Sequence, residues 1–293
     1  MIRHSTVFFV LAAIALTSVT LVASATGMAA GQPQTVTDSQ PLRPVGLAAA
    51  PTVITATGVL TTDIIGAVNT FRALLGANNG VGGSFTTGRR EINWDAVPDG
   101  FAAPNDLPAD FFNANSPRGA VFAPASVAFQ VSADASNPTS TTTRFGHINP
   151  SYPANFHTFS PERLFTAVDD ELHDVLFLVP RTKFPAAVRG FGVVFTDVEH
   201  NGSASIELFN GAISLGAFAA PANVTSGALS FVGVDFGGHV VTGVTVKSGE
   251  APLGQYTNDL TDGGYFDLVV MDDFIYGEPI SSRVYLPIAV SDR

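Results

Sequence analysis

Short runs rich in Val, Phe, Ile and Thr recur along most of the chain, separated by turn residues such as Gly, Pro, Asn and Asp. Such runs predict β-strands. The clearest are residues 120–122, 127–132, 163–168, 175–179, 188–196, 205–209, 229–234, 240–246 and 265–271. Many short strands at this spacing are typical of a sandwich or a barrel. We therefore predict an all-β protein, a jelly-roll-like β-sandwich with long loops.

The hydrophobic period changes from strand-like to helical over residues 64–75. Asp63 stands where an N-cap is expected, and Gly76 stands where a helix stops. The apolar positions that line one face of this helix are Ile64, Ile65, Val68, Phe71, Leu74 and Leu75. A second helix, of one turn, is predicted at residues 108–112, and Asn210-Gly211 predicts a tight hairpin turn.

The amino terminus predicts export. Arg3 and His4 precede an apolar run at residues 7–22, which is followed by Ala23-Ser24-Ala25. This order is typical of a signal peptide over residues 1–25, and the run is short for a membrane span of ~20 residues. After cleavage we expect no membrane span, whereas an uncleaved anchor is the alternative. Residues 26–52 read as a flexible linker, residues 53–280 as one β-sandwich domain with an elaborated amino-terminal half, and residues 281–293 as a tail.

The chain is acidic: it contains 25 Asp and Glu residues but only 14 Lys and Arg residues, which gives a net charge of −11. Such a charge repels phosphate backbones, so nucleic acid is not an expected partner, and the lack of a phosphate-binding glycine motif argues against a nucleotide. There is no cysteine, which excludes disulfides and favours a bacterial source for an exported protein. The six histidines never occur at zinc-site spacing. We expect a bacterial protein that is secreted or held at the cell surface.

Several longer motifs carry a resemblance to known sequences. They are residues 88–95 (GRREINWD), 111–119 (FFNANSPRG), 145–150 (FGHINP), 159–165 (FSPERLF), 190–198 (GFGVVFTDV) and 271–279 (MDDFIYGEP). Together they resemble a family of uncharacterised exported bacterial β-sandwich proteins. Some members look like surface proteins with a carboxy-terminal PEP-type sorting tail. The resemblance implies export and a β-sandwich but no activity, and residues 285–290 are too short to serve as a membrane anchor.

The densest polar cluster surrounds the only tryptophan of the chain. A stacking ring flanked by hydrogen-bonding groups is an arrangement that sugar-binding proteins use. The candidate ligand-binding residues on this interpretation are Arg90, Asn93, Trp94 and Asp95. The alternative is structural: a strand that turns Ile92 and Trp94 to one face and pairs the charged side chains on the other.

Acidic residues at the ends of two apolar strands suggest a hard cation. Neighbouring carboxylates on a strand point to opposite faces, so adjacent acids cannot form a glycosidase pair. They can join distant carboxylates around Ca²⁺, which takes six to eight oxygen ligands. The candidate ligands for a structural Ca²⁺ are Asp197, Glu199, Asp272 and Asp273. The alternative is that these acids accept backbone hydrogen bonds in turns.

No catalytic residue is predicted, because the nucleophile-elbow and metalloenzyme motifs are absent. The leading hypothesis is an exported, non-catalytic binding or structural module at or outside the cell surface, with an extracellular glycan as its ligand. Whether it is an enzyme stays open. One alternative is an extracellular hydrolase acting on polysaccharide, whose acids converge only in three dimensions. Another is a self-associating surface or matrix protein.

Overall fold

The computed structural model describes residues 50–124 and 126–281. The expected signal peptide, most of the expected linker and the tail after Ser281 lie outside the described residues, so their assignments stay predictions.

Two antiparallel sheets dominate the fold. The larger sheet contains, in spatial order, β1 (Thr52–Gly58), β11 (Leu229–Asp235), β8 (Gly190–Thr196), β13 (Val270–Gly277), β5 (Phe165–Ala167) and β4 (Phe129–Val131), and β2 (Arg89–Ile92) also pairs with β13. The smaller sheet contains β10 (Ile213–Ala219), β9 (Ala204–Asn210), β12 (Gly243–Ser248), β6 (Leu172–Phe177) and β3 (Ala120–Ala123). A short ribbon joins β14 (Ile280–Ser281) to β7 (Ala186–Ala187). The all-β sandwich is thereby confirmed, and its jelly-roll connectivity remains a prediction.

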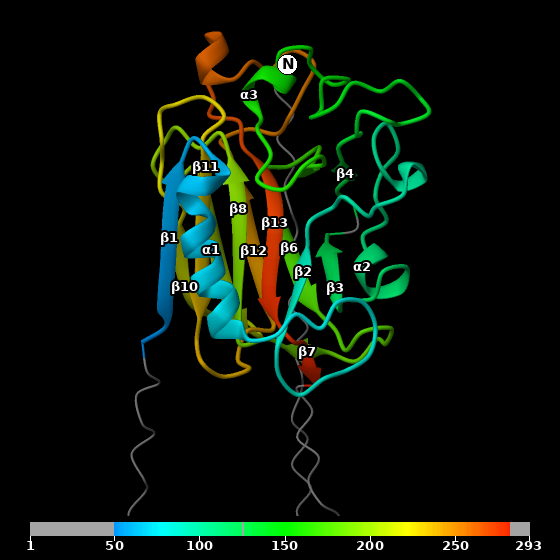
Figure 1. Ribbon diagram of the computed structural model, residues 1–293, viewed down its shortest axis with the longest axis vertical. Coiled ribbons are helices and arrows are strands. Elements are labelled where there is room, and N and C mark those ends of the chain that lie inside the picture. Colours follow the sequence, from blue (N-terminus) through cyan, green and yellow to red (C-terminus); the bar gives the residue numbers. More distant parts are fainter. Residues whose placement is uncertain (1–49, 125, 282–293) are drawn as a thin grey trace, which may run out of the picture. The chain divides into compact units, whose positions relative to one another are not determined.

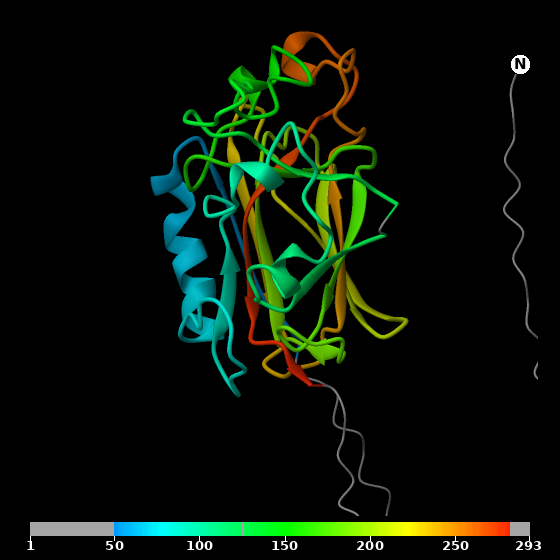
Figure 2. The ribbon, with the colours of Figure 1, turned by 90° about the vertical axis from the view of Figure 1, so that its right-hand side faces the viewer.

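The layers follow from the alternation of side chains along the strands. On β8, Val193 and Phe195 face the other sheet, while Val194 faces outward onto α1 (Thr61–Leu75). Figure 2 shows α1, the seven-stranded sheet and the five-stranded sheet as successive layers. A third apolar cluster, which includes Phe156 and Leu268, lies at the end that carries α3 (Tyr152–Asn155) in Figure 1. None of the described helices is long and apolar enough to cross a membrane.

The predicted helices are present, with shifted starts. α1 begins two residues before Asp63, whose carboxylate accepts the Leu60 N–H at 2.8 Å, so Asp63 stabilises the first turn from inside the helix. Gly76 ends α1 as predicted, with a φ of 100° that glycine adopts without strain. The one-turn helix α2 is Phe111–Ala114, three residues later than its predicted start. Single 3₁₀ turns occur at η1 (Asp99–Phe101) and η2 (Leu260–Asp262).

Two strands differ from the sequence-based prediction. β1 starts at Thr52, within the predicted linker. β13 starts at Val270, whereas the prediction placed a strand at residues 265–271. The acids Asp272 and Asp273 look like a strand end in the sequence, yet they lie inside β13, where both are buried and hydrogen-bonded. The predicted hairpin joins β9 to β10, and its turn is Gly211-Ala212, one residue later than expected.

Paired glycines let α1 approach the sheet closely. Gly192 of β8 lies opposite Gly233 of β11, and Phe71 packs over both. A Cβ at Gly192 would lie 2.7 Å from Phe71 Cε1, and a Cβ at Gly233 would lie 2.9 Å from Phe71 Cδ2. The helix layer therefore depends on the absence of side chains at this pair.

We expect Gly192→Ala to lower the free energy of unfolding by about 1–3 kcal/mol, because the added methyl group overpacks the contact with Phe71. Urea denaturation measures the change. Gly238→Ala is the matched control, since nothing lies within 4 Å of a Cβ there. Phe71→Leu should recover part of the loss in the double variant. Equal stability of the two alanine variants would contradict this account.

Candidate functional site

A polar pocket of about 480 Å³ lies where α1, β2 and β13 meet on the outer side of the seven-stranded sheet. These three elements lie near one another in Figure 1, although β13 is far from α1 and β2 in the sequence. The lining residues are Thr61, Ile65, Arg72, Asn78, Gly80, Glu91, Asn93, Arg118, Phe159, Ser160, Pro161 and Asp273.

Arg72 of α1 organises one wall of the pocket. Its Nη2 lies 2.8 Å from Glu91 Oε2 and 3.0 Å from Asp273 Oδ2, so a single nitrogen bridges carboxylates from β2 and β13. Glu91 also accepts from Arg89 Nε at 2.6 Å. Two carboxylates that the sequence places far apart thus converge at this wall.

Ser160 connects the pocket to a buried acid pair. Its Oγ lies 2.7 Å from Asp273 Oδ1 and 3.0 Å from Asp272 Oδ1, and the Phe159 N–H donates to Asp272 Oδ2 at 2.6 Å. Burial and the charge of Asp273 raise the pKa of Asp272 well above its usual value. Burial also raises the pKa of Asp273, against the opposing hydrogen bond from Ser160 and the charge of Arg72. Burial thus opposes the ionisation of Asp272 more strongly, and Asp273 is the member that faces the pocket.

Arg118 brings a second guanidinium to the pocket. Its Cζ lies 5.4 Å from the centre of the Phe112 ring, and its Nη1 donates to Ser116. Its Nε is buried and has no hydrogen-bond partner among the described residues. Burial lowers the pKa of Arg118, which nevertheless stays charged. Arg118 thus lines the pocket, and its unpaired Nε is shielded from solvent.

The structure separates the four residues predicted to bind a ligand. Trp94 is 1% exposed and stacks on Phe165 at a centroid distance of 4.1 Å, while its Nε1 donates to the Asp272 carbonyl at 2.8 Å. Arg90 is fully buried in an ion pair with Glu278. Both side chains belong to the interior, and neither lines the pocket. The structural alternative expected an inward face for Trp94 but not for Arg90. Trp94 lies two residues beyond the end of β2, at a positive φ of 67°, and its ring packs against Phe165 and Phe274.

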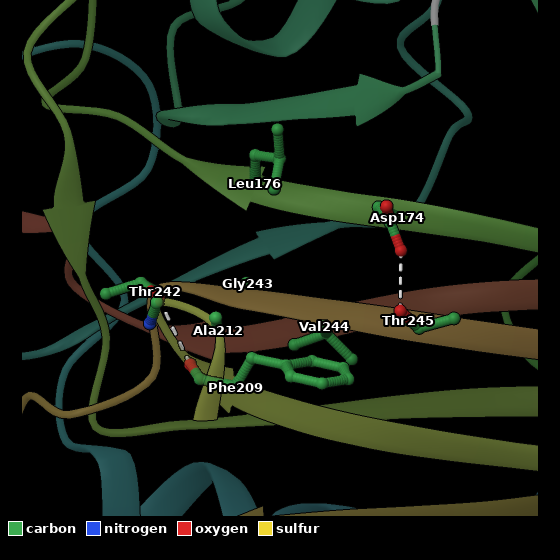
Figure 3. Close-up of a pocket in the computed structure, with 9 residues that line it drawn as sticks. Asp174, Leu176, Phe209, Ala212, Thr242, Gly243, Val244 and Thr245 are labelled. Carbon is green, nitrogen blue, oxygen red and sulfur yellow. Dashed lines mark hydrogen bonds between the residues drawn. The ribbon is translucent and has the colours of Figure 1, made fainter. Parts of the chain in front are cut away.

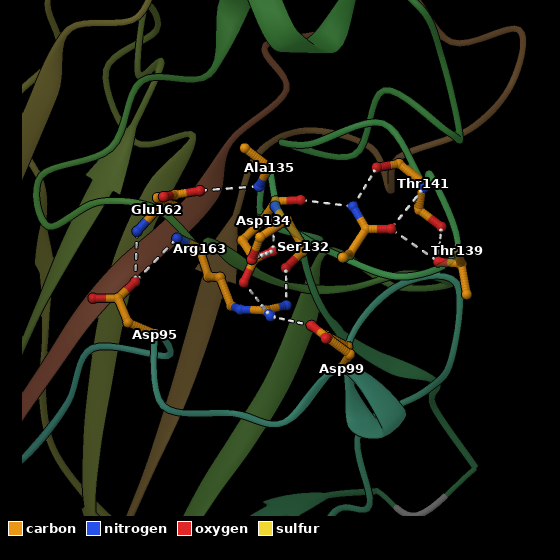
Figure 4. A network of polar contacts seen from close by, with 12 residues as sticks. Asp95, Asp99, Ser132, Asp134, Ala135, Thr139, Thr141, Glu162 and Arg163 are labelled. Atoms are coloured by element: carbon orange, nitrogen blue, oxygen red, sulfur yellow. Dashed lines mark hydrogen bonds and ion pairs between the residues drawn. The ribbon is translucent and has the colours of Figure 1, made fainter.

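Asn93 and Asp95 lie at the surface. Asn93 lines the pocket. The Asp95 carboxylate accepts the backbone N–H groups of Glu162 at 2.7 Å and Arg163 at 3.1 Å, as Figure 4 shows. Burial raises the pKa of Asp95. Asp95 thus fixes the segment that carries Ser160.

Arg163 holds the same segment from its other side. Its Nη2 lies 2.6 Å from a carboxylate oxygen of both Asp99 and Asp134, and its Nη1 donates to the Ser132 carbonyl at 3.0 Å (Figure 4). These contacts tie residues 160–163 to β4 and to η1. Ser160 is therefore held in place by a network that lies outside the pocket.

The four acids predicted to bind a cation divide into two groups. Asp197 and Glu199 follow β8 and lie together with Asp259. Asp272 and Asp273 instead contact Ser160 at the pocket. The strand register explains the separation: Val270 pairs with Thr196, and β13 then runs antiparallel to β8, away from its end. Asp259 was not predicted, although the run of acids at residues 259–267 is a signal that could have indicated it.

A smaller pocket of about 290 Å³ lies on the five-stranded sheet and includes Leu176, Phe209 and Val244 (Figure 3). Its polar side chains are already paired: Thr245 donates to Asp174 at 2.6 Å, and Thr242 donates to the Phe209 carbonyl at 3.2 Å. Unlike the pocket beside α1, it presents mainly apolar side chains and backbone.

No protein-family model, curated protein sequence or solved structure matches this chain. The fold and the pocket define its class as an antiparallel β-sandwich with a helix on one face and a polar pocket beside that helix. The resemblance to exported bacterial proteins stays a prediction.

Proposed function

We propose that the protein is an exported, non-catalytic module of jelly-roll type that binds a neutral carbohydrate outside the cell, in the pocket between α1, β2 and β13. The observation that carries the proposal is the pocket itself, which combines polar side chains from four distant segments in about 480 Å³. A few convergent polar groups in a concave site are typical of small-ligand binding. The signal-peptide pattern of residues 1–25 supports export.

The charges of the pocket favour a neutral ligand. Arg72 and Arg118 are balanced by Glu91 and Asp273, so neither an anion nor a cation is preferred. Sugars offer hydroxyl groups that both donate and accept, which matches a site that holds guanidinium donors and carboxylate acceptors. Ile65 and Phe159 add apolar surface for the C–H face of a sugar ring.

The convergence of Glu91 and Asp273 supports the hydrolase as a second candidate. Glycosidases place two carboxylates across the scissile bond, and the pKa of one of them is raised. Asp273 has a raised pKa. Arg72, however, forms ion pairs with both carboxylates, which holds them in place and favours binding over bond cleavage.

The direct test is a glycan array followed by calorimetry with the ligand found. We expect Arg118→Gln to weaken binding about 10-fold or more, since a hydrogen bond to a charged group contributes about 1.5–3 kcal/mol, and Asn93→Ala to weaken it roughly 3-fold. Asn210→Ala, in the exposed β9–β10 hairpin, is the control and should leave the Kd unchanged.

Two outcomes would contradict the binding proposal: no glycan bound at all, or a Kd that both pocket variants leave unaltered. Release of shortened oligosaccharides that is lost in Glu91→Gln would establish the hydrolase instead. Growth of the particle size with concentration, in the absence of ligand, would favour the self-associating protein.

A further inference from the structure

A second group of charged residues lies apart from the pocket, at the end of the sandwich near η2. Asp197 and Glu199 follow β8, Asp259 precedes η2, and Asp267 precedes β13. Asp197, Asp259 and Asp267 are fully buried, and Glu199 is 8% exposed. One carboxylate oxygen from each of Asp197, Glu199 and Asp259 lies within 4.8 Å of the others. Asp267 lies close enough for its charge to act on both Asp197 and Glu199.

The backbone holds three of these carboxylates, those of Asp197, Asp259 and Asp267, in fixed orientations. The Gly227 N–H donates to Asp197 Oδ1 at 2.6 Å. The N–H groups of Glu199 and His200 donate to Asp267 Oδ2 at 3.0 and 2.7 Å. The Asp259 carboxylate accepts from the Leu268 N–H at 3.0 Å and from the Thr261 N–H at 2.8 Å. Asp197, Asp259 and Asp267 are therefore oriented before any ligand arrives.

Four oxygens of this group are buried without a donor in the part of the chain that the structure describes: Asp197 Oδ2, Asp267 Oδ1 and both carboxylate oxygens of Glu199. None of the ion pairs among the described residues joins a Lys or Arg to the four acids. A buried carboxylate without a hydrogen-bond donor or a cation destabilises the folded state. Natural proteins therefore pair such groups or use them to coordinate a metal.

The type of ligand atom indicates which metal ion the group would bind. All available ligands are oxygens, which excludes the soft metals that require sulfur or nitrogen. Ca²⁺ binds oxygens at 2.3–2.6 Å, so two ligands on opposite sides of one ion lie roughly 4.6–5.2 Å apart. The three carboxylate oxygens of Asp197, Glu199 and Asp259 lie within 4.8 Å of one another, close enough to bind one such ion together. Mg²⁺ needs shorter distances and usually keeps several waters, which suits a dry cluster of carboxylates less well.

We infer that Asp197, Glu199, Asp259 and Asp267 form a Ca²⁺ site that joins the end of β8 to the loop around η2 and to the start of β13. This site is independent of the carbohydrate pocket, because none of its residues lines that pocket. The ion supplies the positive charge that the four unpaired oxygens lack. It thereby fixes the loops that cover the apolar cluster containing Phe156 and Leu268.

The test uses the full chain, stripped with a chelator and then titrated with CaCl₂. We expect one Ca²⁺ per chain by calorimetry and a rise in Tm of several degrees, because an ion that binds only the folded state stabilises it by mass action. MgCl₂ at the same concentration should raise the Tm less.

Two near-isosteric variants and one control assign the site. Glu199→Gln and Asp197→Asn should each weaken Ca²⁺ binding at least 100-fold, while the Tm of the chelator-treated protein stays close to that of the parent chain, since the amide keeps the size of the carboxyl group. Asp262→Asn changes an exposed acid of the same loop, outside the cluster, and should bind Ca²⁺ like the parent chain.

A parent chain whose Tm is the same in chelator and in millimolar Ca²⁺ would overturn the inference. So would Ca²⁺ binding that survives in both cluster variants. If one variant fails to fold, the other variant and the titration of the parent chain still decide the question. Glycan binding is measured in a separate experiment. If no glycan binds, the Ca²⁺ titration still tests the Ca²⁺ site.

Discussion

Glu278→Gln is expected to lower the free energy of unfolding by about 3–5 kcal/mol, because it leaves the buried guanidinium of Arg90 without its counter-ion. Both side chains are fully buried, and the pair is bidentate: Arg90 Nε lies 2.6 Å from Glu278 Oε2, and Nη2 lies 2.7 Å from Oε1. Glutamine would present an NH₂ group where Arg90 and a second donor, Asn79 Nδ2 or the Phe85 N–H, already point.

The same arginine also fixes the loop that leads into β2. Arg90 Nη1 donates to the carbonyl oxygens of Gly80 and Gly82, both at 2.8 Å. Urea denaturation of Glu278→Gln measures the loss, and Glu207→Gln, on the solvent side of β9, should change stability by no more than about 0.5 kcal/mol. A loss at residue 278 as small as the loss at residue 207 would mean that the pair contributes little.

Acid should destabilise the protein through His173. This residue of β6 is 2% exposed, lies among the rings of Phe122, Phe129 and Phe165, and has no hydrogen-bond partner for either ring nitrogen among the described residues. Burial lowers the pKa of His173 from its ordinary value of 6.5 to about 3. The folded protein therefore keeps the ring neutral, whereas the unfolded chain binds a proton below pH 6.5.

This difference gives the sign of the effect. The contribution of His173 to stability is fully present above pH 6.5 and is lost as the pH falls from 6.5 towards 3, at about 1.4 kcal/mol per unit. At pH 4.5 the loss should reach about 3 kcal/mol. His173→Phe should remove this part of the pH dependence.

The measurement is the free energy of unfolding in urea at pH 7.5 and 4.5 for the parent chain and for His173→Phe. The two chains share the titration of all other groups, so their difference isolates His173. His157→Gln, at a partly exposed position, should keep the pH dependence of the parent chain. Parallel curves for the parent and His173→Phe would show that the ring is protonated in the folded state as well.

Local sequence patterns predicted those elements well that bury one apolar face and expose the other. The helix face from Ile64 to Leu75 and the stop at Gly76 could be predicted because period and cap are local properties. β13 could not be located, since Asp272 and Asp273 resemble a strand end until Ser160 and Arg72 are known to bind them. Trp94 looked like a ligand platform because its sequence neighbours are polar, although its neighbours in space are Phe165 and Phe274.

In both candidate sites, the sequence indicated some of the residues, and only the fold showed which of them meet. Asp197 and Glu199 stood out in the sequence as acids at a strand end, but Asp259 and Asp267 join them only through the loop around η2. Which acids meet depends on the pairing of Val270 with Thr196, a register that no local pattern specifies. The pocket, likewise, draws Arg72, Glu91 and Asp273 from segments that have no sequence relation.

By itself the sequence determined the all-β class, the helix, the hairpin and the acidic character of the chain, because these follow from side-chain periodicity, turn residues and composition. The tertiary structure alone decided that Trp94 and Arg90 are interior and that Asp272 and Asp273 serve the pocket. It alone also brought four acids together near η2. The physical reason is that a polar side chain becomes a core residue or a ligand according to the partners it meets, and strand register and loop packing select those partners.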